Sequence, residues 1–298
     1  QKAEDSRLEA ERIADAEKEM KNFEIIINSR GAEQESLRVA GKEYMRTRDE
    51  FWNRKAPILF PIVGKLRDLK TKIDGETYCM NQHGFARDKE FKLFEETGNS
   101  LEFVLSWDEE SLKLYPFKFE LYIKYTIVGK TVNVDVKVKN VDNKDIYFNI
   151  GGHPGFKLPM EDGLKFEDYS IEYEYEETFE SPGVESNGTL NFLNPEKWNN
   201  VKKFNLDYQY FTIDAIVAPH LKSRWVKLTH NDKGIKFDYY GFNTLAIWTK
   251  PNAPFVCLEP WLGYADRHDS DYEFIHKDDI VRLEKDKDYC VGYSITIL

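Results

Sequence analysis

Strict alternation of apolar and polar residues is the feature that most constrains the fold of this chain. The clearest runs are residues 117–125, 132–139, 171–175, 225–229 and 235–239. Successive side chains of a β-strand point to opposite faces of its sheet, so each run predicts a strand with one buried face. Turn residues at 74–75, 128–130 and 231–234 separate such runs and predict hairpins.

Helical patterns are weak after residue 22. We find no apolar repeat of helical period over twelve residues or more in residues 23–298. The sequence therefore predicts an all-β chain of mainly antiparallel strands, arranged as two large sheets packed face to face.

Residues 1–22 differ from the rest of the chain. They are rich in Glu, Asp, Lys, Arg and Ala and contain no aromatic residue, glycine or proline. Charged pairs at helical spacing and a thin apolar stripe predict a solvated helix or a frayed tail, with a partner-binding helix as the alternative. We therefore divide the chain into an N-terminal extension over residues 1–22 and a β-sandwich domain over residues 23–298.

Composition limits the classes of function. Of the 298 residues, 41% are hydrophobic and 14% aromatic, which is enough for a large core. The formal net charge is −11 and the sequence has no basic stripe, which argues against a nucleic-acid partner. No apolar run approaches the ~20 residues of a membrane span, and no signal-peptide core is present, so we expect no membrane partner.

Cysteine usage gives an expectation for the cellular compartment. Cys79, Cys257 and Cys290 are far apart and odd in number, and they show no metal-binding spacing. This pattern is typical of reduced thiols, so we expect a cytoplasmic protein without a metal site of the Cys-x-x-Cys type.

One loop combines a histidine with several small residues. Residues 149–156 read Asn-Ile-Gly-Gly-His-Pro-Gly-Phe. Pro154 fixes its own φ and favours an extended conformation at His153, and the glycines permit tight turns and close approach of a ligand. Histidine titrates near neutral pH, so His153 is a candidate for acid/base chemistry, and a turn histidine held by packing is an equally good interpretation.

Two further segments carry candidate ligand-binding side chains. Arg54 precedes an apolar run with prolines, and its planar guanidinium suits a hydroxyl or phosphate group; a surface salt bridge is the alternative. His83 and Arg87 lie close together in a segment with a glycine, where a polar ligand would find several donors. A hydrogen-bonded structural loop explains that segment equally well.

A carboxylate in an apolar stretch forms the last candidate. Glu259 ends a continuous apolar run of the kind expected for a strand buried on both faces. Burial there is costly unless the carboxylate is hydrogen-bonded or functional, and partial burial would raise its pKa toward the range of a general base. An ion pair with an arginine is the structural alternative. Trp248 and Trp261 flank this segment, and their aromatic faces suit the apolar C–H patches of sugars.

Four of these motifs together resemble the aldose 1-epimerase (galactose mutarotase-like) superfamily and match its LacX-like branch. They read Phe-Pro-Ile-Val-Gly at 60–64, His-Gly-Phe-Ala-Arg at 83–87, Gly-Gly-His-Pro-Gly-Phe at 151–156 and Cys-Leu-Glu-Pro-Trp at 257–261. The motifs occur in the order of the family, and the resemblance extends from about residue 23 to the C-terminus. It implies a galactose mutarotase-like β supersandwich with the site in a cleft on one sheet.

The resemblance also implies roles for single residues. His153 would be the general acid and Glu259 the general base, while His83 and Arg87 would bind sugar hydroxyls. Asp214 lies where the family often places another ligand-binding acid.

One departure bears on the choice of sugar. Relatives of this branch often carry arginine where this chain has Lys65, and lysine keeps the charge but loses the bidentate geometry. Hexose-6-phosphate mutarotases of the superfamily bind the phosphate through arginines, a role open to Arg54 and Arg87.

We therefore predict an aldose 1-epimerase that interconverts the α and β anomers of a hexose or related aldose. Its partner would be a small-molecule sugar, and no metal or nucleotide cofactor is implied because the reaction requires only proton transfer. The alternatives are a hexose-6-phosphate mutarotase and a non-catalytic carbohydrate-binding or sensing protein. A polysaccharide hydrolase fits less well, because it would usually need a pair of carboxylates.

Overall fold

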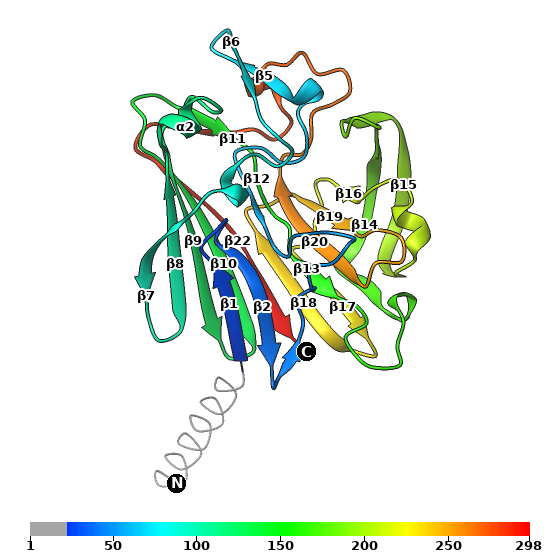
Figure 1. Ribbon diagram of the computed structural model, residues 1–298. Coiled ribbons are helices and arrows are strands. Elements are labelled where there is room, and N and C mark those ends of the chain that lie inside the picture. The colour runs from blue at the N-terminus through cyan, green and yellow to red at the C-terminus, as the bar shows by residue number, and fades with distance from the viewer. Residues whose placement is uncertain (1–22) are drawn as a thin grey trace, which may run out of the picture.

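The computed structural model describes residues 23–298, which form five antiparallel sheets (Figure 1). The expected helix or tail over residues 1–22 lies outside the described residues. The longest α-helix of the described part, α2 (Glu109–Leu112), has four residues, which agrees with the weak helical patterns of the sequence. Short 3₁₀ turns complete the helical content: η1 (Arg67–Leu69), η2 (Ala86–Asp88), η3 (Phe166–Asp168), η4 (Tyr208–Phe211) and η5 (Phe274–His276).

The largest sheet contains all five alternating runs. Its nine strands lie in the order β15 (Leu190–Asn205), β14 (Ser170–Val184), β17 (Trp225–His230), β18 (Lys233–Tyr240), β22 (Asp288–Ile297), β10 (Thr131–Asn140), β9 (Phe119–Val128), β8 (Ser100–Ser106) and β7 (Lys92–Glu96). Along β10, Val132, Val134, Val136 and Val138 are buried, whereas the residues between them are partly exposed. The alternation is therefore confirmed as a set of half-buried strands.

A six-stranded sheet forms the second large layer. It contains β16 (Ile216–Ala218), β19 (Thr244–Trp248), β20 (Phe255–Leu262), β12 (Ile150–Gly152) and β4 (Ile58–Leu59), with β13 (Gly155–Lys157) also paired to β20. Three small sheets complete the fold: β1 (Phe23–Asn28), β2 (Glu33–Val39) and β3 (Lys42–Glu43); β11 (Ile146–Phe148) with β21 (Val281–Leu283); and β5 (Lys70–Ile73) with β6 (Glu76–Cys79). The predicted turns at 74–75, 128–130 and 231–234 join β5 to β6, β9 to β10 and β17 to β18.

The main core lies between the two large sheets. Phe156 of β13 meets Phe237 of β18 with ring centroids 6.0 Å apart. Phe60, just after β4, packs 4.9 Å from Phe119 of β9. Because these aromatic contacts cross from one sheet to the other, the prediction of two sheets packed face to face is confirmed.

β20 is buried along its whole length, as its apolar sequence predicts. Val256 and Leu258 belong to the core between the large sheets. Successive side chains alternate, so Cys257, Glu259 and Trp261 point to the opposite face. That face is covered by the segment around Trp52 and by the β14–β15 hairpin, which rises beside the six-stranded sheet in Figure 1. The candidate site lies under this cover.

Candidate active site

The register of the six-stranded sheet brings His153 and Glu259 together. β12 and β13 pair with β20 in one continuing antiparallel register, and His153 lies between these two short strands. Position 153 therefore falls directly opposite position 259. The carbonyl of Pro154 accepts the N–H of Leu258 at 3.1 Å, which holds the loop to the strand. Residues far apart in the sequence thus face each other.

His153 Nε2 lies 3.1 Å from Glu259 Oε2. The two atoms are close but are not aligned as a hydrogen bond. Among the described residues, Glu259 Oε2 has no hydrogen-bond donor and His153 Nδ1 has no hydrogen-bond partner. His153 is 6% exposed and Glu259 is 1% exposed. Unpartnered polar atoms at this depth cost free energy, so the pair is suited to receive hydrogen bonds from a ligand. The ionisable neighbour of Glu259 within the described part of the chain is thus this histidine, and not the arginine of the ion pair expected as the structural alternative.

Burial controls the protonation of the pair. Burial, followed by the charge of Arg87, lowers the pKa of His153 to about 3. Burial raises the pKa of Glu259 well above its ordinary value, and the carboxylate of Asp214 raises it further. The low dielectric therefore disfavours both the imidazolium of His153 and the carboxylate of Glu259. The general-acid and general-base roles expected from the sequence need a protonated His153 and an ionised Glu259, and this form differs from the neutral pair by transfer of one proton within the pair.

Two tryptophans pack around the imidazole of His153. The Trp52 ring lies over it with a centroid separation of 4.6 Å and an interplanar angle of 30°. Trp248, at the end of β19, meets it edge-on at 5.6 Å. These contacts exclude water from one side of the ring and hold its orientation.

A buried arginine positions the segment that carries Trp52. The Arg46 guanidinium donates hydrogen bonds to the carbonyls of Trp52 and Arg54 and to the carboxylate of Asp49. Its flat face also lies 4.1 Å from the centroid of the Phe255 ring on β20. Arg46 therefore ties this irregular segment to the sheet that bears Glu259.

His83 is held by the backbone of the neighbouring segment. Its ring Nδ1 accepts the backbone N–H of Gly64 at 3.0 Å, and its backbone N–H donates to the Gly64 carbonyl at 2.8 Å. Burial, with His153 nearby, holds the pKa of His83 well below its usual range, so the neutral ring carries its proton on Nε2. The hydrogen-bonded loop foreseen as the alternative is present, and the ring also lines the cavity described below.

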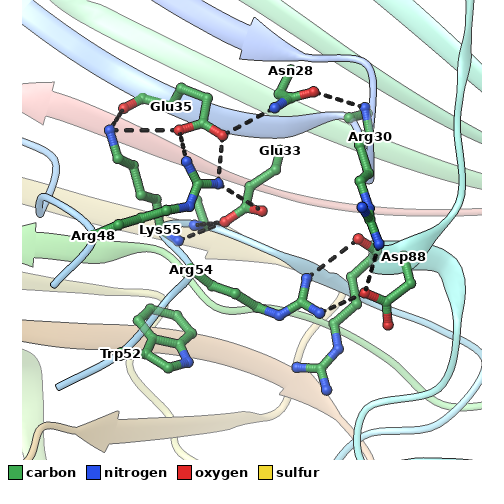
Figure 2. Close-up of polar contacts among 12 residues, drawn as sticks. Asn28, Arg30, Glu33, Glu35, Arg48, Trp52, Arg54, Lys55 and Asp88 are labelled. Atoms are coloured by element: carbon green, nitrogen blue, oxygen red, sulfur yellow. Dashed lines mark hydrogen bonds and ion pairs between the residues drawn. The ribbon is translucent and has the colours of Figure 1, made fainter. Parts of the chain in front are cut away.

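Arg54 and Arg87 form a positive wall. The Arg54 Nη2 donates to Asp88 at 2.6 Å, and Figure 2 shows its guanidinium directed at this carboxylate. The salt bridge expected as the alternative is therefore present. Arg87 Nη2 donates to the Gln82 carbonyl at 2.6 Å, while its buried Nε has no hydrogen-bond partner among the described residues. Burial and the charge of Arg54 lower the pKa of Arg87 to about 10, so the pair would favour an anion or several hydroxyls.

These side chains surround one cavity of about 420 Å³. Trp261 lines it, and so do all seven residues predicted as catalytic or substrate-binding: Arg54, His83, Arg87, His153, Asp214, Trp248 and Glu259. Burial raises the pKa of Asp214, whose Oδ1 accepts the adjacent Ala215 N–H at 2.8 Å. Lys65 does not line the cavity, although its side chain approaches Gly188 in the β14–β15 turn.

Sequence reasoning missed several lining residues. Trp52, Gln82 and Lys250 face the cavity, and each lies within two positions of a predicted residue, which was a usable signal. Val184 and Leu190, from the β14–β15 hairpin, also line it. Nothing in the local pattern of the hairpin indicated this, because its position over the sheet depends on tertiary contacts.

The glycines beside His153 make room for protein side chains. A Cβ at Gly152 would lie 2.7 Å from the ring of Tyr293 in β22. A Cβ at Gly155 would lie 2.8 Å from the side chain of Arg46. The sequence had suggested that these glycines admit a ligand; the structure instead gives them a packing role.

Comparison with known proteins agrees with this arrangement. The model of the aldose 1-epimerase family matches residues 16–289. This chain belongs to the aldose 1-epimerase family. The plasmid protein LacX of Lactococcus lactis subsp. lactis is 36% identical over 270 residues, which cover 87% of this chain and 90% of the relative. The family and LacX-like branch expected from the four motifs are thus confirmed.

Solved structures of the family share the fold. A galactose mutarotase related enzyme from Lactobacillus acidophilus has a TM-score of 0.87 at 31% identity, covering 93% of this chain and 94% of that chain. A galactose mutarotase-like protein from Lactobacillus casei has a TM-score of 0.83 at 28% identity, and the match covers 93% of this chain and 97% of that chain. The galactose mutarotase-like all-β fold is therefore confirmed, and family membership supports a mutarotase-type function on a sugar. In residues 23–298, every helix is too short or too polar to cross a membrane.

Proposed function

We propose that this protein is an aldose 1-epimerase that interconverts the α and β anomers of a hexose or related aldose. The observation that carries the proposal is the acid/base pair of His153 and Glu259, 3.1 Å apart on the wall of a cavity. Both side chains have a buried polar atom without a partner among the described residues, so a sugar can supply hydrogen bonds that the protein does not.

The reaction needs one transferable proton, shared between His153 and Glu259. Over a full turnover the pair neither gains nor loses a proton. A sugar whose C1 hydroxyl donates a hydrogen bond to Glu259 favours the ionised carboxylate, and the proton then resides on His153. Glu259 takes the C1 hydroxyl proton, the bond between C1 and the ring oxygen breaks, and His153 protonates that oxygen. Rotation about C1–C2 in the open aldehyde, followed by the reverse transfers on the other face, gives the second anomer.

The remaining lining residues would orient the sugar. Arg87 and His83 offer N–H donors, and the Asp214 carboxylate offers an acceptor on another part of the wall. Trp52 and Trp248 supply apolar faces for the C–H patches of a pyranose ring. A cavity of about 420 Å³ is within the usual range for small-molecule sites.

The test is the rate at which a freshly dissolved anomer reaches equilibrium, followed by polarimetry or NMR. We expect wild-type protein to accelerate this rate for at least one common aldose, and His153→Gln to reduce the acceleration by about 10²–10⁴-fold. Rates equal to buffer across common aldoses and their 6-phosphates would contradict the enzyme assignment.

A hexose 6-phosphate is the second candidate substrate, favoured by the adjacent guanidinium groups of Arg54 and Arg87. Charged hydrogen bonds contribute about 1.5–3 kcal/mol, so Arg87→Met should raise KM for a 6-phosphate by about tenfold to a hundredfold. The KM of the neutral sugar should rise less. Equal effects on both sugars would show that no phosphate reaches this wall.

A non-catalytic sugar-binding or sensing protein is the alternative of another class. Calorimetric binding of a sugar without any change in its anomer exchange would favour it. The presence of both members of the acid/base pair supports the enzyme instead. The free thiols of Cys79, Cys257 and Cys290 support a reducing compartment such as the cytoplasm.

A further inference from the structure

A thiol lies beside the acid/base pair. Cys257 precedes Glu259 by two positions on β20, so both side chains point to the same face of the sheet. One imidazole nitrogen of His153, the Cys257 sulfur and one carboxylate oxygen of Glu259 all lie within 4.8 Å of one another, and all three residues are buried. The proposed reaction makes no use of the thiol.

Imidazole, thiolate and carboxylate are the side-chain ligands of zinc sites, and three protein ligands leave a fourth position for water. Glu259 Oε2, which already lies 3.1 Å from His153 Nε2, is buried without a hydrogen-bond partner among the described residues, so coordination would satisfy an atom that now lacks one. We propose that His153, Cys257 and Glu259 form a site for a thiophilic divalent cation, with Zn²⁺ as the model ion. Its fourth position would face the cavity.

The distances permit this with modest movement. A tetrahedral zinc with bonds of about 2.3 Å to sulfur and about 2.0 Å to nitrogen places these two atoms about 3.5 Å apart. Donor atoms now separated by at most 4.8 Å must therefore close by about 1.3 Å or less when the metal binds.

The surrounding charge limits the affinity. Arg46 acts on the Cys257 thiol and Arg87 on the His153 ring, and both guanidinium groups oppose a second cation nearby. We therefore expect binding that a chelator reverses readily, unlike that of a structural zinc site. Because the metal would occupy the carboxylate and the imidazole, it would inhibit the epimerase; this consequence alone rests on the proposed function.

The binding test uses Co²⁺, whose thiolate complexes show a sulfur-to-cobalt charge-transfer band in the near ultraviolet. Cys79 and Cys290 are exposed and would also bind metal, so the experiment uses a Cys79→Ser/Cys290→Ser background. We expect one Co²⁺ per chain with this band, displaced by Zn²⁺ and abolished by adding Cys257→Ser. Absence of the band, or a band that persists in the Cys257→Ser protein, would overturn the proposal.

A second variant protects the test against misfolding. His153→Gln keeps the thiol and should weaken Co²⁺ binding at least tenfold, so an unchanged affinity would also overturn the site. In the Cys79→Ser/Cys290→Ser background without further substitution, Zn²⁺ should slow anomer exchange, and EDTA should restore the rate. If the protein shows no exchange at all, the proposed function fails while the cobalt band still decides the metal site. Inhibition by Zn²⁺ in a protein that shows no cobalt–thiolate band would place the metal elsewhere and refute the proposed site.

Discussion

Replacing Glu259 by glutamine should inactivate the protein and at the same time stabilise its fold. The carboxylate is 1% exposed, and its Oε2 has no hydrogen-bond donor among the described residues. Burial and the nearby charge of Asp214 raise its pKa, which means that the native state disfavours the ionised form. Glutamine has nearly the same shape and no charge, so Glu259→Gln removes this cost.

The size of the effect follows from proton linkage. A carboxyl group with a raised native pKa binds more protons in the native than in the unfolded state, so its contribution to stability falls as pH rises above the ordinary value of about 4.3. The Gln variant has no such term. Its advantage in unfolding free energy should therefore grow by about 1.4 kcal/mol per pH unit, until the pH reaches the native pKa of Glu259.

The titration of His153 changes stability with pH in the opposite direction, and this effect cancels when wild type is compared with Glu259→Gln. Its native pKa is lowered to about 3, so the unfolded state binds more protons and stability rises with pH up to about 6.5. This contribution is present in both proteins. The difference between wild type and Glu259→Gln thus reports mainly on the carboxyl group.

The assay is urea denaturation at several pH values between 4.5 and 8, combined with anomer-exchange rates. Glu177→Gln is the matched control: Glu177 is also buried, but its carboxylate accepts the N–H of Ser223 at 2.6 Å and that of Lys222 at 3.3 Å. This control should lose about 1–3 kcal/mol, because an amide cannot accept both bonds equally well, and should keep its activity.

We expect Glu259→Gln to lose about 10²–10⁴-fold in rate, or about 3–5 kcal/mol of transition-state stabilisation. Full activity would refute the role of general base. A stability difference that stays constant with pH would refute the argument that burial strains this carboxylate, whatever the activity.

Two further predictions concern packing and a buried ion pair, and urea denaturation measures both. Gly152→Ala should cost about 1–3 kcal/mol, because the new Cβ would lie 2.7 Å from Tyr293, whereas Gly98→Ala, which meets no atom within 4 Å, should have little effect. Similar costs for the two variants would contradict the packing role. Lys277→Met should cost about 3–5 kcal/mol, because it leaves Asp266 buried without the ammonium 2.6 Å away, and adding Asp266→Asn should recover part of this loss. No recovery in the double variant would show that charge is not the cause.

Much of the fold could be predicted because its signals are local. The alternation in residues 132–139 depends only on neighbouring side chains, and it marks β10 almost to its ends. The edge strand β15 was not predicted: its sequence is polar and mostly exposed, so it lacks a clear period of two. Its pairing with β14 comes from a long hairpin that propensity does not reveal.

The sequence by itself determined the candidate residues and the family, because both are properties of residue types in order. His153 and Glu259 were recognisable from the Gly-Gly-His-Pro and Leu-Glu-Pro-Trp motifs. Only the tertiary structure decided that they face each other, since antiparallel pairing of β12 and β13 with β20 sets that register. It also decided how far the two groups are removed from water, which shifts the pKa of each: solvation depends on the atoms packed around a group, and Trp52 and the β14–β15 hairpin come from distant parts of the chain.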